Sequence, residues 1–105
     1  MNEQRVKPAD CNSMAEVRRG VDRLDQDIVA LLSERFRYMD AAARIKPTRG
    51  AVRDEARKAE VIANARRHAK AAGVPDAVVA DLYERLVEGS IAYELERFDQ
   101  TRGKI

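Results

Sequence analysis

The stretch IVALLSERFRYMDAAARIK, residues 28–46, decides the fold that the sequence predicts. It belongs to an apolar row that advances in alternating steps of three and four residues, the spacing of one face of an α-helix. The row consists of Met14, Val17, Val21, Leu24, Ile28, Leu31, Arg35, Tyr38, Ala42 and Ile45. Arg35 is its one charged member. A guanidinium stays protonated, so a buried one requires an anionic partner, unless its long side chain reaches solvent.

The first predicted helix has clear signals at both ends. Ser13 and Glu16 stand three residues apart, as in a capping box at a helix N-terminus. Pro47 lacks an amide hydrogen and disfavours helix in the residue before it, so the helix is expected to end at about residue 46. No stretch alternates with the period of a strand, and the predicted fold class is all-α.

Two further helices follow a loop over residues 47–53. Asp54 is a good N-cap for the second helix, and Gly73 is a plausible C-terminal cap. Pro75 and Asp76 supply start signals for a third helix, which is expected to continue to about residue 100. The prediction is therefore three helices in one domain over residues 13–105, preceded by a flexible segment over residues 1–12.

The length of the first helix predicts the oligomeric state. More than thirty residues at about 1.5 Å each span about 50 Å, whereas a compact chain of this size has a radius of gyration of about 13 Å. The apolar row would project beyond a monomeric globule and needs a partner. We expect an intertwined helical homodimer, in which a second copy covers the row.

Composition excludes several classes of function. Lys and Arg number 20 and Asp and Glu 18, so the net charge of +2 does not suggest a dedicated nucleic-acid binder. No segment is apolar enough to span a membrane or to form the core of a signal peptide. Cys11 and His68 are the only residues of their kind. No disulfide framework, metal site or serine–histidine–aspartate triad is therefore expected, and a reducing, cytoplasmic setting fits best.

Two polar residues continue an apolar row of the third helix. The row contains Val79, Tyr83, Leu86, Ser90 and Glu94. Glu94 has two interpretations: an ion pair with Arg35 or Lys46, or a carboxyl group that faces a cavity and stays neutral there because desolvation disfavours charge.

Basic residues stand at four positions where they could form one site. Arg18 lies near the start of the first helix, Arg35 in its middle, Lys46 at its end and Arg57 in the first turns of the second helix. Together they would suit a small dianion, because guanidinium groups bind carboxylates with two parallel hydrogen bonds. The chain has 20 basic residues, so this pattern alone does not identify a site.

The motifs that carry these residues resemble the all-helical (type II) chorismate mutases, and within them the isochorismate-pyruvate lyase branch. The matching residues are Arg18 and Arg35 in VRRGVDRLDQDIVALLSERF, Lys46 in RIK, Asp54 and Arg57 in VRDEARKAEVI, and Ser90 and Glu94 in EGSIAYELE. The resemblance covers nearly the whole chain. The terminal stretches DCNSMAEVR and FDQTRG are similar to the lyase branch.

The resemblance implies a function and roles for these residues. It implies a dimer with two sites, in which Arg18 of one chain and Arg35 of the other bind the carboxylates of chorismate or isochorismate. Lys46 would bind a carboxylate and the ether oxygen, and Glu94 would be a second hydrogen-bond donor to that oxygen. The catalytic residues would then be Lys46, Glu94 and Arg35. Asp54, Arg57 and Ser90 would contribute to binding, and no cofactor is implied.

Two reactions and a non-catalytic alternative stay open. Chorismate mutase activity gives prephenate, and isochorismate-pyruvate lyase activity gives salicylate and pyruvate. Mutases commonly have a glutamate after the second-helix arginine to accept the ring hydroxyl, but this sequence has Lys58, with Asp54 as a candidate replacement. A helical dimerisation module without activity is the remote alternative.

Overall fold

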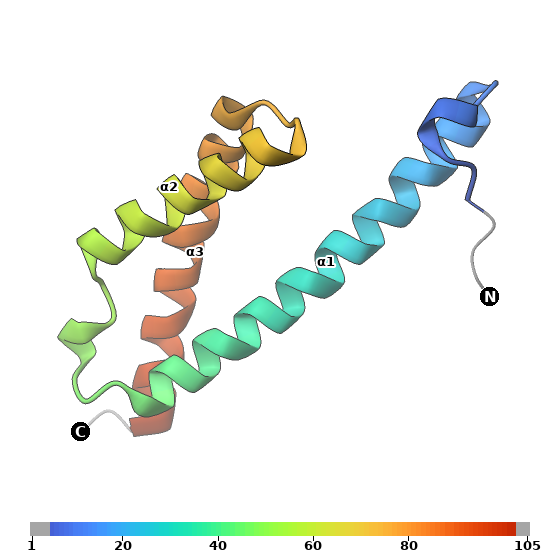
Figure 1. Ribbon diagram of the computed structural model, residues 1–105. Helices are drawn as coiled ribbons and strands as arrows, with labels where there is room; N and C mark the ends of the chain where they lie inside the picture. The colour runs from blue at the N-terminus through green and yellow to red at the C-terminus, as the bar shows by residue number, and fades with distance from the viewer. Residues whose placement is uncertain (1–4, 103–105) are drawn as a thin grey trace. The chain divides into compact units, whose positions relative to one another are not determined.

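The computed structural model describes residues 5–102, and every regular element in this range is helical. The elements are η1 (Pro8–Asp10), α1 (Met14–Ile45), η2 (Arg49–Ala51), α2 (Glu55–Ala72) and α3 (Asp76–Arg102) (Figure 1). The all-α class with a long first helix is thereby confirmed. Residues 1–4 and 103–105 lie outside the described range. The division into a flexible segment over residues 1–12 and a helical domain over residues 13–105 stays a prediction.

The chain divides into two compact units, residues 1–37 and residues 38–105. α1 contributes to both. Its residues up to 37 belong to the first unit, and its last turns belong to the second.

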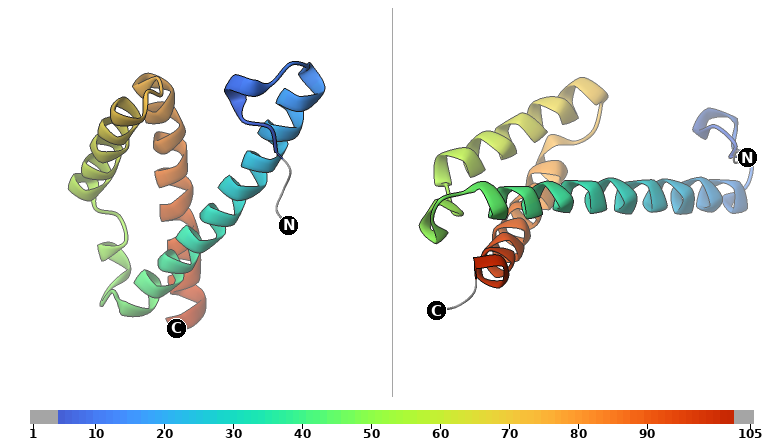
Figure 2. Two further views of the ribbon diagram at one scale, coloured as in Figure 1. Left: turned by 45° about the vertical axis from the view of Figure 1, so that its right-hand side comes forward. Right: turned by 90° about the horizontal axis from the view of Figure 1, so that it is seen from below.

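The first unit contains η1 and the beginning of α1. The Ser13 hydroxyl accepts a hydrogen bond from the Glu16 amide at 3.2 Å, and the Glu16 carboxylate accepts one from the Asn12 amide at 2.7 Å. The predicted capping box thus forms. In the standard pattern the amide of the N-cap residue donates to the glutamate, whereas here the donor is the amide of the preceding residue, Asn12. The segment before the helix turns back over the first turns of α1 (Figure 2), where Val6 and Cys11 line a small hollow.

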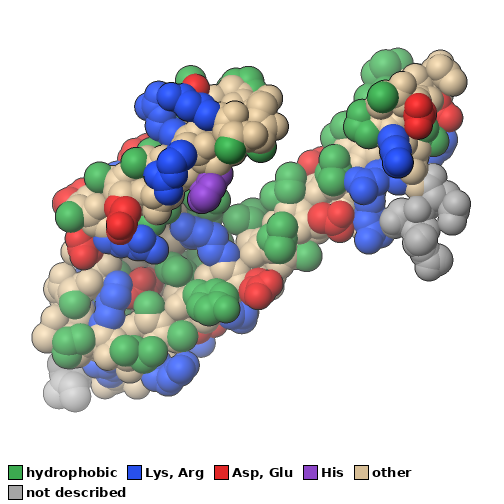
Figure 3. Space-filling view, in the orientation of Figure 1, with side chains coloured by type: hydrophobic (Ala, Val, Ile, Leu, Met, Phe, Trp, Pro, Cys, Tyr) green, Lys and Arg blue, Asp and Glu red, His purple; other side chains and the backbone are tan. Residues whose placement is uncertain are grey.

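The apolar row of α1 is largely exposed in this chain. The exposed fractions are 50% for Val21, 46% for Leu24, 53% for Ile28 and 65% for Leu31. Figure 3 shows hydrophobic side chains along the surface of α1. Soluble monomers rarely expose contiguous apolar surface of this kind, so the row is a candidate for an interface.

The second unit packs α2 against α3, with a tight turn between them (Figures 1 and 2). Asp54 caps α2 by accepting the Arg57 amide at 3.0 Å, and Gly73 ends the helix with a φ of 76°. A side chain at this left-handed position would be strained, which explains why glycine stands there. Both caps match the sequence prediction. α3 continues to Arg102, slightly beyond the expected end.

The hydrophobic core of the second unit lies where the end of α1, the following loop and α3 meet. Its buried members are Ala43, Val52, Val87, Ile91 and Phe98. Polar contacts reinforce this junction: Asp40 on α1 accepts a hydrogen bond from the Tyr93 hydroxyl of α3 at 2.7 Å. Within residues 5–102, no helix has the length and apolar character needed to cross a membrane.

Candidate active site

Lys46 and Glu94 form the centre of the candidate site. Lys46 directly follows α1, and its Nζ lies 2.9 Å from Oε2 of Glu94 and 3.4 Å from the carbonyl oxygen of Val52. The Glu94 side chain is only 5% exposed, whereas that of Lys46 is 31% exposed. The structure therefore contains the Lys46 ion pair, one of the two interpretations that the sequence left open.

The Glu94 carboxylate keeps bonding capacity despite its burial. Its Oε2 is buried and has no hydrogen bond of regular geometry in the described chain, although the ammonium of Lys46 lies at ion-pair distance. Buried polar oxygens are normally hydrogen-bonded, and one without such a bond calls for an explanation. Glu94 thus presents an acceptor, or after protonation a donor, beside a partly exposed cation.

Ser90 lies one turn before Glu94 on α3 and is also buried, with 4% exposure. Its hydroxyl donates to the carbonyl oxygen of Leu86 at 2.7 Å. This bond within the helix satisfies the hydroxyl hydrogen and holds the oxygen close to the backbone. The helical spacing in the sequence correctly placed both polar residues on the buried face.

Asp54 and Arg57 have local structural contacts at the start of α2. Asp54 is exposed, and one of its carboxylate oxygens caps the helix. The Arg57 guanidinium is 62% exposed and donates to Glu60 at 2.8 Å. Such exposed pairs stabilise a helix by only a few tenths of a kcal/mol, so Arg57 can leave Glu60 at little cost.

Arg18 and Arg35 belong to the first unit. Arg18 is exposed on the early turns of α1, and Arg35 is half-buried further along the same helix. The structure thus brings together Lys46 and Glu94, with Ser90 one turn away, in the unit of residues 38–105. The two arginines lie in the other unit.

Lys58 is held by two acidic residues of α3. Its Nζ lies 2.7 Å from a carboxylate oxygen of Glu84 and 2.7 Å from one of Glu88. The hydrogen bonds to these two carboxylates raise the pKa of Lys58, and the bond to Glu84 has the larger effect. Glu88 also binds Arg53 at 2.7 Å, and hydrogen bonds from Arg53 and then Lys58 lower its pKa to about 2. The cation at position 58 is therefore neutralised within the protein.

No sequence pattern predicts the contact that Arg102 makes with the end of α1. Its Nη2 lies 3.0 Å from the carbonyl oxygen of Ala43, 3.2 Å from that of Arg44 and 2.5 Å from that of Lys46. These residues stand 56 to 59 positions away from Arg102 in the sequence. No local pattern links residues at such a distance.

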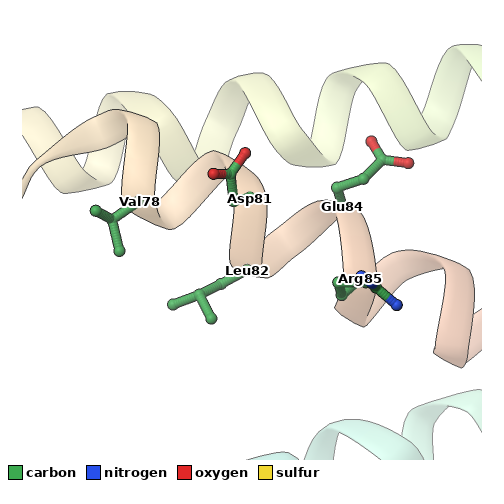
Figure 4. Close-up of a pocket in the computed structure, with 5 residues that line it drawn as sticks. All are labelled: Val78, Asp81, Leu82, Glu84 and Arg85. Carbon is green, nitrogen blue, oxygen red and sulfur yellow. The ribbon is translucent and has the colours of Figure 1, made fainter.

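A hollow on the early turns of α3 contains none of the predicted site residues. It is lined by Val78, Asp81, Leu82, Glu84 and Arg85, and Figure 4 shows Glu84 directed toward α2 while Val78 and Leu82 point away from it. No group of three or more metal-binding side chains is found in residues 5–102.

Comparison with known proteins identifies the family of this helical protein. The chain belongs to the chorismate mutase type II family, whose sequence profile matches residues 17–95. Over 96 residues it is 33% identical to the isochorismate pyruvate lyase of Pseudomonas aeruginosa, a match that covers 91% of this chain and 95% of that enzyme. The family resemblance read from the motifs is thereby confirmed.

Proposed function

We propose that this protein catalyses a pericyclic reaction of a chorismate-type dianion. Its main activity in this proposal is that of a chorismate mutase, which converts chorismate to prephenate. The observation that carries the proposal is the Lys46–Glu94 pair at 2.9 Å, in a member of the chorismate mutase type II family. The pair combines a partly exposed cation with a buried carboxyl group that retains bonding capacity.

This pair supplies what the rearrangement requires. The C–O bond that breaks leaves negative charge on the ether oxygen, while no proton needs to move to or from the protein. Lys46 donates to that oxygen through its ammonium, and Glu94 donates in its protonated form. Holding the flexible substrate in a compact conformation supplies the rest of the rate enhancement, so neither a nucleophile nor a metal ion is required.

A homodimer completes the site in this proposal. The exposed apolar row of α1, with Leu24 at 46% and Ile28 at 53%, supports burial against a second chain. Arg18 of one chain and Arg35 of the other bind the two carboxylates of the substrate. Arg57 leaves Glu60 to reach the bound dianion.

Binding contacts from the second and third helices define the rest of the substrate site. Ser90 lines the buried face beside Glu94, and Asp54 offers its second carboxylate oxygen to the ring hydroxyl. That hydroxyl is the group by which chorismate and isochorismate differ, so the contact bears on substrate choice.

Isochorismate-pyruvate lyase activity is the second candidate. The 33% identity to a protein of that name along nearly the full chain supports it. Lys58 supports it too, because this position lacks the carboxylate with which mutases commonly accept the hydroxyl of chorismate. The lyase reaction breaks the same C–O bond with a hydrogen shift, so the same cations would stabilise the same developing charge.

Product analysis tests the proposal. The purified protein is given chorismate and isochorismate separately, and products are identified by NMR against samples without protein. Prephenate from chorismate with little salicylate from isochorismate supports the mutase. Efficient release of salicylate and pyruvate makes the protein a lyase instead. No reaction with either substrate overturns the proposal and favours a non-catalytic dimerisation module.

A further inference from the structure

Arg102 lies where the last turn of α3 meets the end of α1. Its guanidinium stacks over the Phe98 ring, 4.1 Å from the ring centre, and directs Nη2 at the carbonyl oxygens of Ala43, Arg44 and Lys46. Figures 1 and 2 show the C-terminal end of α3 beside these last turns of α1. All of these residues belong to the unit of residues 38–105.

These carbonyl groups need an external donor. The last carbonyl groups of a helix have no amide partner within it, and they carry the negative end of the helix dipole. Many helices solve this with a glycine in the left-handed conformation, as α2 does with Gly73. α1 is followed by Lys46 and Pro47 instead, and the cation from α3 takes over the role of the cap.

Arg102 caps α1 at Lys46, the residue whose ammonium group donates to the ether oxygen in the proposed reaction. The Lys46 amide makes the last backbone bond of the helix, to the carbonyl of Ala42 at 2.9 Å, and Arg102 binds the Lys46 carbonyl. The backbone of Lys46 is therefore held on both sides of its Cα. From this fixed origin its side chain reaches Glu94 at 2.9 Å.

We propose that Arg102 is a positioning residue, which holds the end of α1 so that Lys46 presents its ammonium to the reacting oxygen. This inference rests on the proposed function, since it assigns Lys46 to catalysis. Arg102 acts through the backbone and does not touch substrate. A misplacement of about 1 Å in a catalytic group can lower a rate by about a hundredfold, so a remote cap can matter for turnover.

The test compares three variants of the full chain. Arg102→Ala removes the cap, and Arg102→Lys retains the charge but not the planar group that reaches several carbonyls. Arg66→Ala is the matched control, because it removes an arginine that ties α2 to Asp76 of α3 at 2.7 Å, away from Lys46. For each variant, kcat and KM are measured with the substrate that the wild type converts, and hydrogen exchange of the Lys46 amide is followed by NMR.

We expect Arg102→Ala to lower kcat by about tenfold to a hundredfold with a smaller change in KM, and to accelerate exchange of the Lys46 amide. Arg102→Lys should fall between wild type and Arg102→Ala, and Arg66→Ala should match the wild type in both measurements. Thermal unfolding reports whether each variant folds, so that a loss of folding is distinguished from a loss of kcat in a folded variant.

Other outcomes overturn the inference. A change in amide exchange without a change in kcat, or the reverse, would show that the cap does not act through Lys46. An equal loss of kcat in Arg66→Ala would show that the effect of Arg102→Ala comes from a general loss of stability and not from the cap. An active wild type with an unaffected Arg102→Ala overturns this inference alone, whereas a wild type that converts neither substrate overturns the proposed function and this role together.

Discussion

Glu94 is an ionisable group at a position where the proposed reaction needs a hydrogen-bond donor. Its side chain is 5% exposed, and its Oε2 lies 2.9 Å from the ammonium of Lys46. A carboxylate only accepts hydrogen bonds, whereas a protonated carboxyl group donates one. A glutamine amide in the same place donates at any ordinary pH. Replacing this single carboxyl group should therefore be visible in the rate.

The Glu94→Gln substitution tests this role. We expect Glu94→Gln to keep or raise kcat/KM at neutral pH, because an amide at this position donates a hydrogen bond without having to be protonated. Glu94→Ala, which removes the donor, should lower kcat/KM by about tenfold or more. Glu96→Gln, an exposed position on the same helix, is the control and should keep the wild-type kcat/KM. An unchanged kcat/KM in Glu94→Ala would rule out the donor role.

At the scale of elements, charged side chains tie the loop after α1 and helix α2 to α3. Glu88 on α3 receives hydrogen bonds from Arg53 of the loop at 2.7 Å and from Lys58 of α2 at 2.7 Å. These bonds lower its pKa from an ordinary value near 4.5 to about 2. A carboxylate with a lower pKa in the folded state stabilises the fold above the unfolded-state value, and that contribution is lost as the pH falls toward 2.

Acid unfolding checks this connection between elements. Glu88→Gln should lower the urea midpoint at neutral pH, and it should lose less stability than the wild type between about pH 4.5 and 2. Circular dichroism in urea at a series of pH values measures both. Glu96→Gln serves as the exposed control on α3. An acid decline as steep in Glu88→Gln as in the wild type would contradict the account.

Helix ends could be predicted because their causes are local. Asp54 caps α2 through an amide three residues away, and Gly73 takes the left-handed conformation that its neighbours in sequence already suggested. The buried positions of Ser90 and Glu94 also followed from helical spacing alone. In each case the interaction that decides the structure lies within one or two turns.

Contacts between distant elements could not be predicted from the residues themselves. The sequence offered two partners for Glu94, and only the packing of α3 against the end of α1 selects Lys46. Lys58 departs from the mutase pattern in the sequence, but its binding to Glu84 and Glu88 depends on how α2 and α3 align. Arg102 carried no signal, because its contacts span 56 to 59 residues.

At the scale of the whole molecule, the proposed site needs residues from two chains. The exposed row of α1 offers an apolar surface for a second copy. In a symmetric dimer the same surfaces meet twice, so each site would take Arg18 from one chain and Lys46 from the other. Two variants that are each inactive should then complement one another when their chains are mixed.

The most direct test of this account is therefore the activity of mixed dimers. Arg18→Ala and Lys46→Ala are purified, assayed separately, and then unfolded and refolded together in equal amounts, with chorismate and isochorismate as substrates. Half of the dimers would contain one chain of each kind, and each of these would hold one intact site. We predict that the mixture regains about a quarter of the wild-type activity. A mixture no more active than its two components would contradict a site shared between chains.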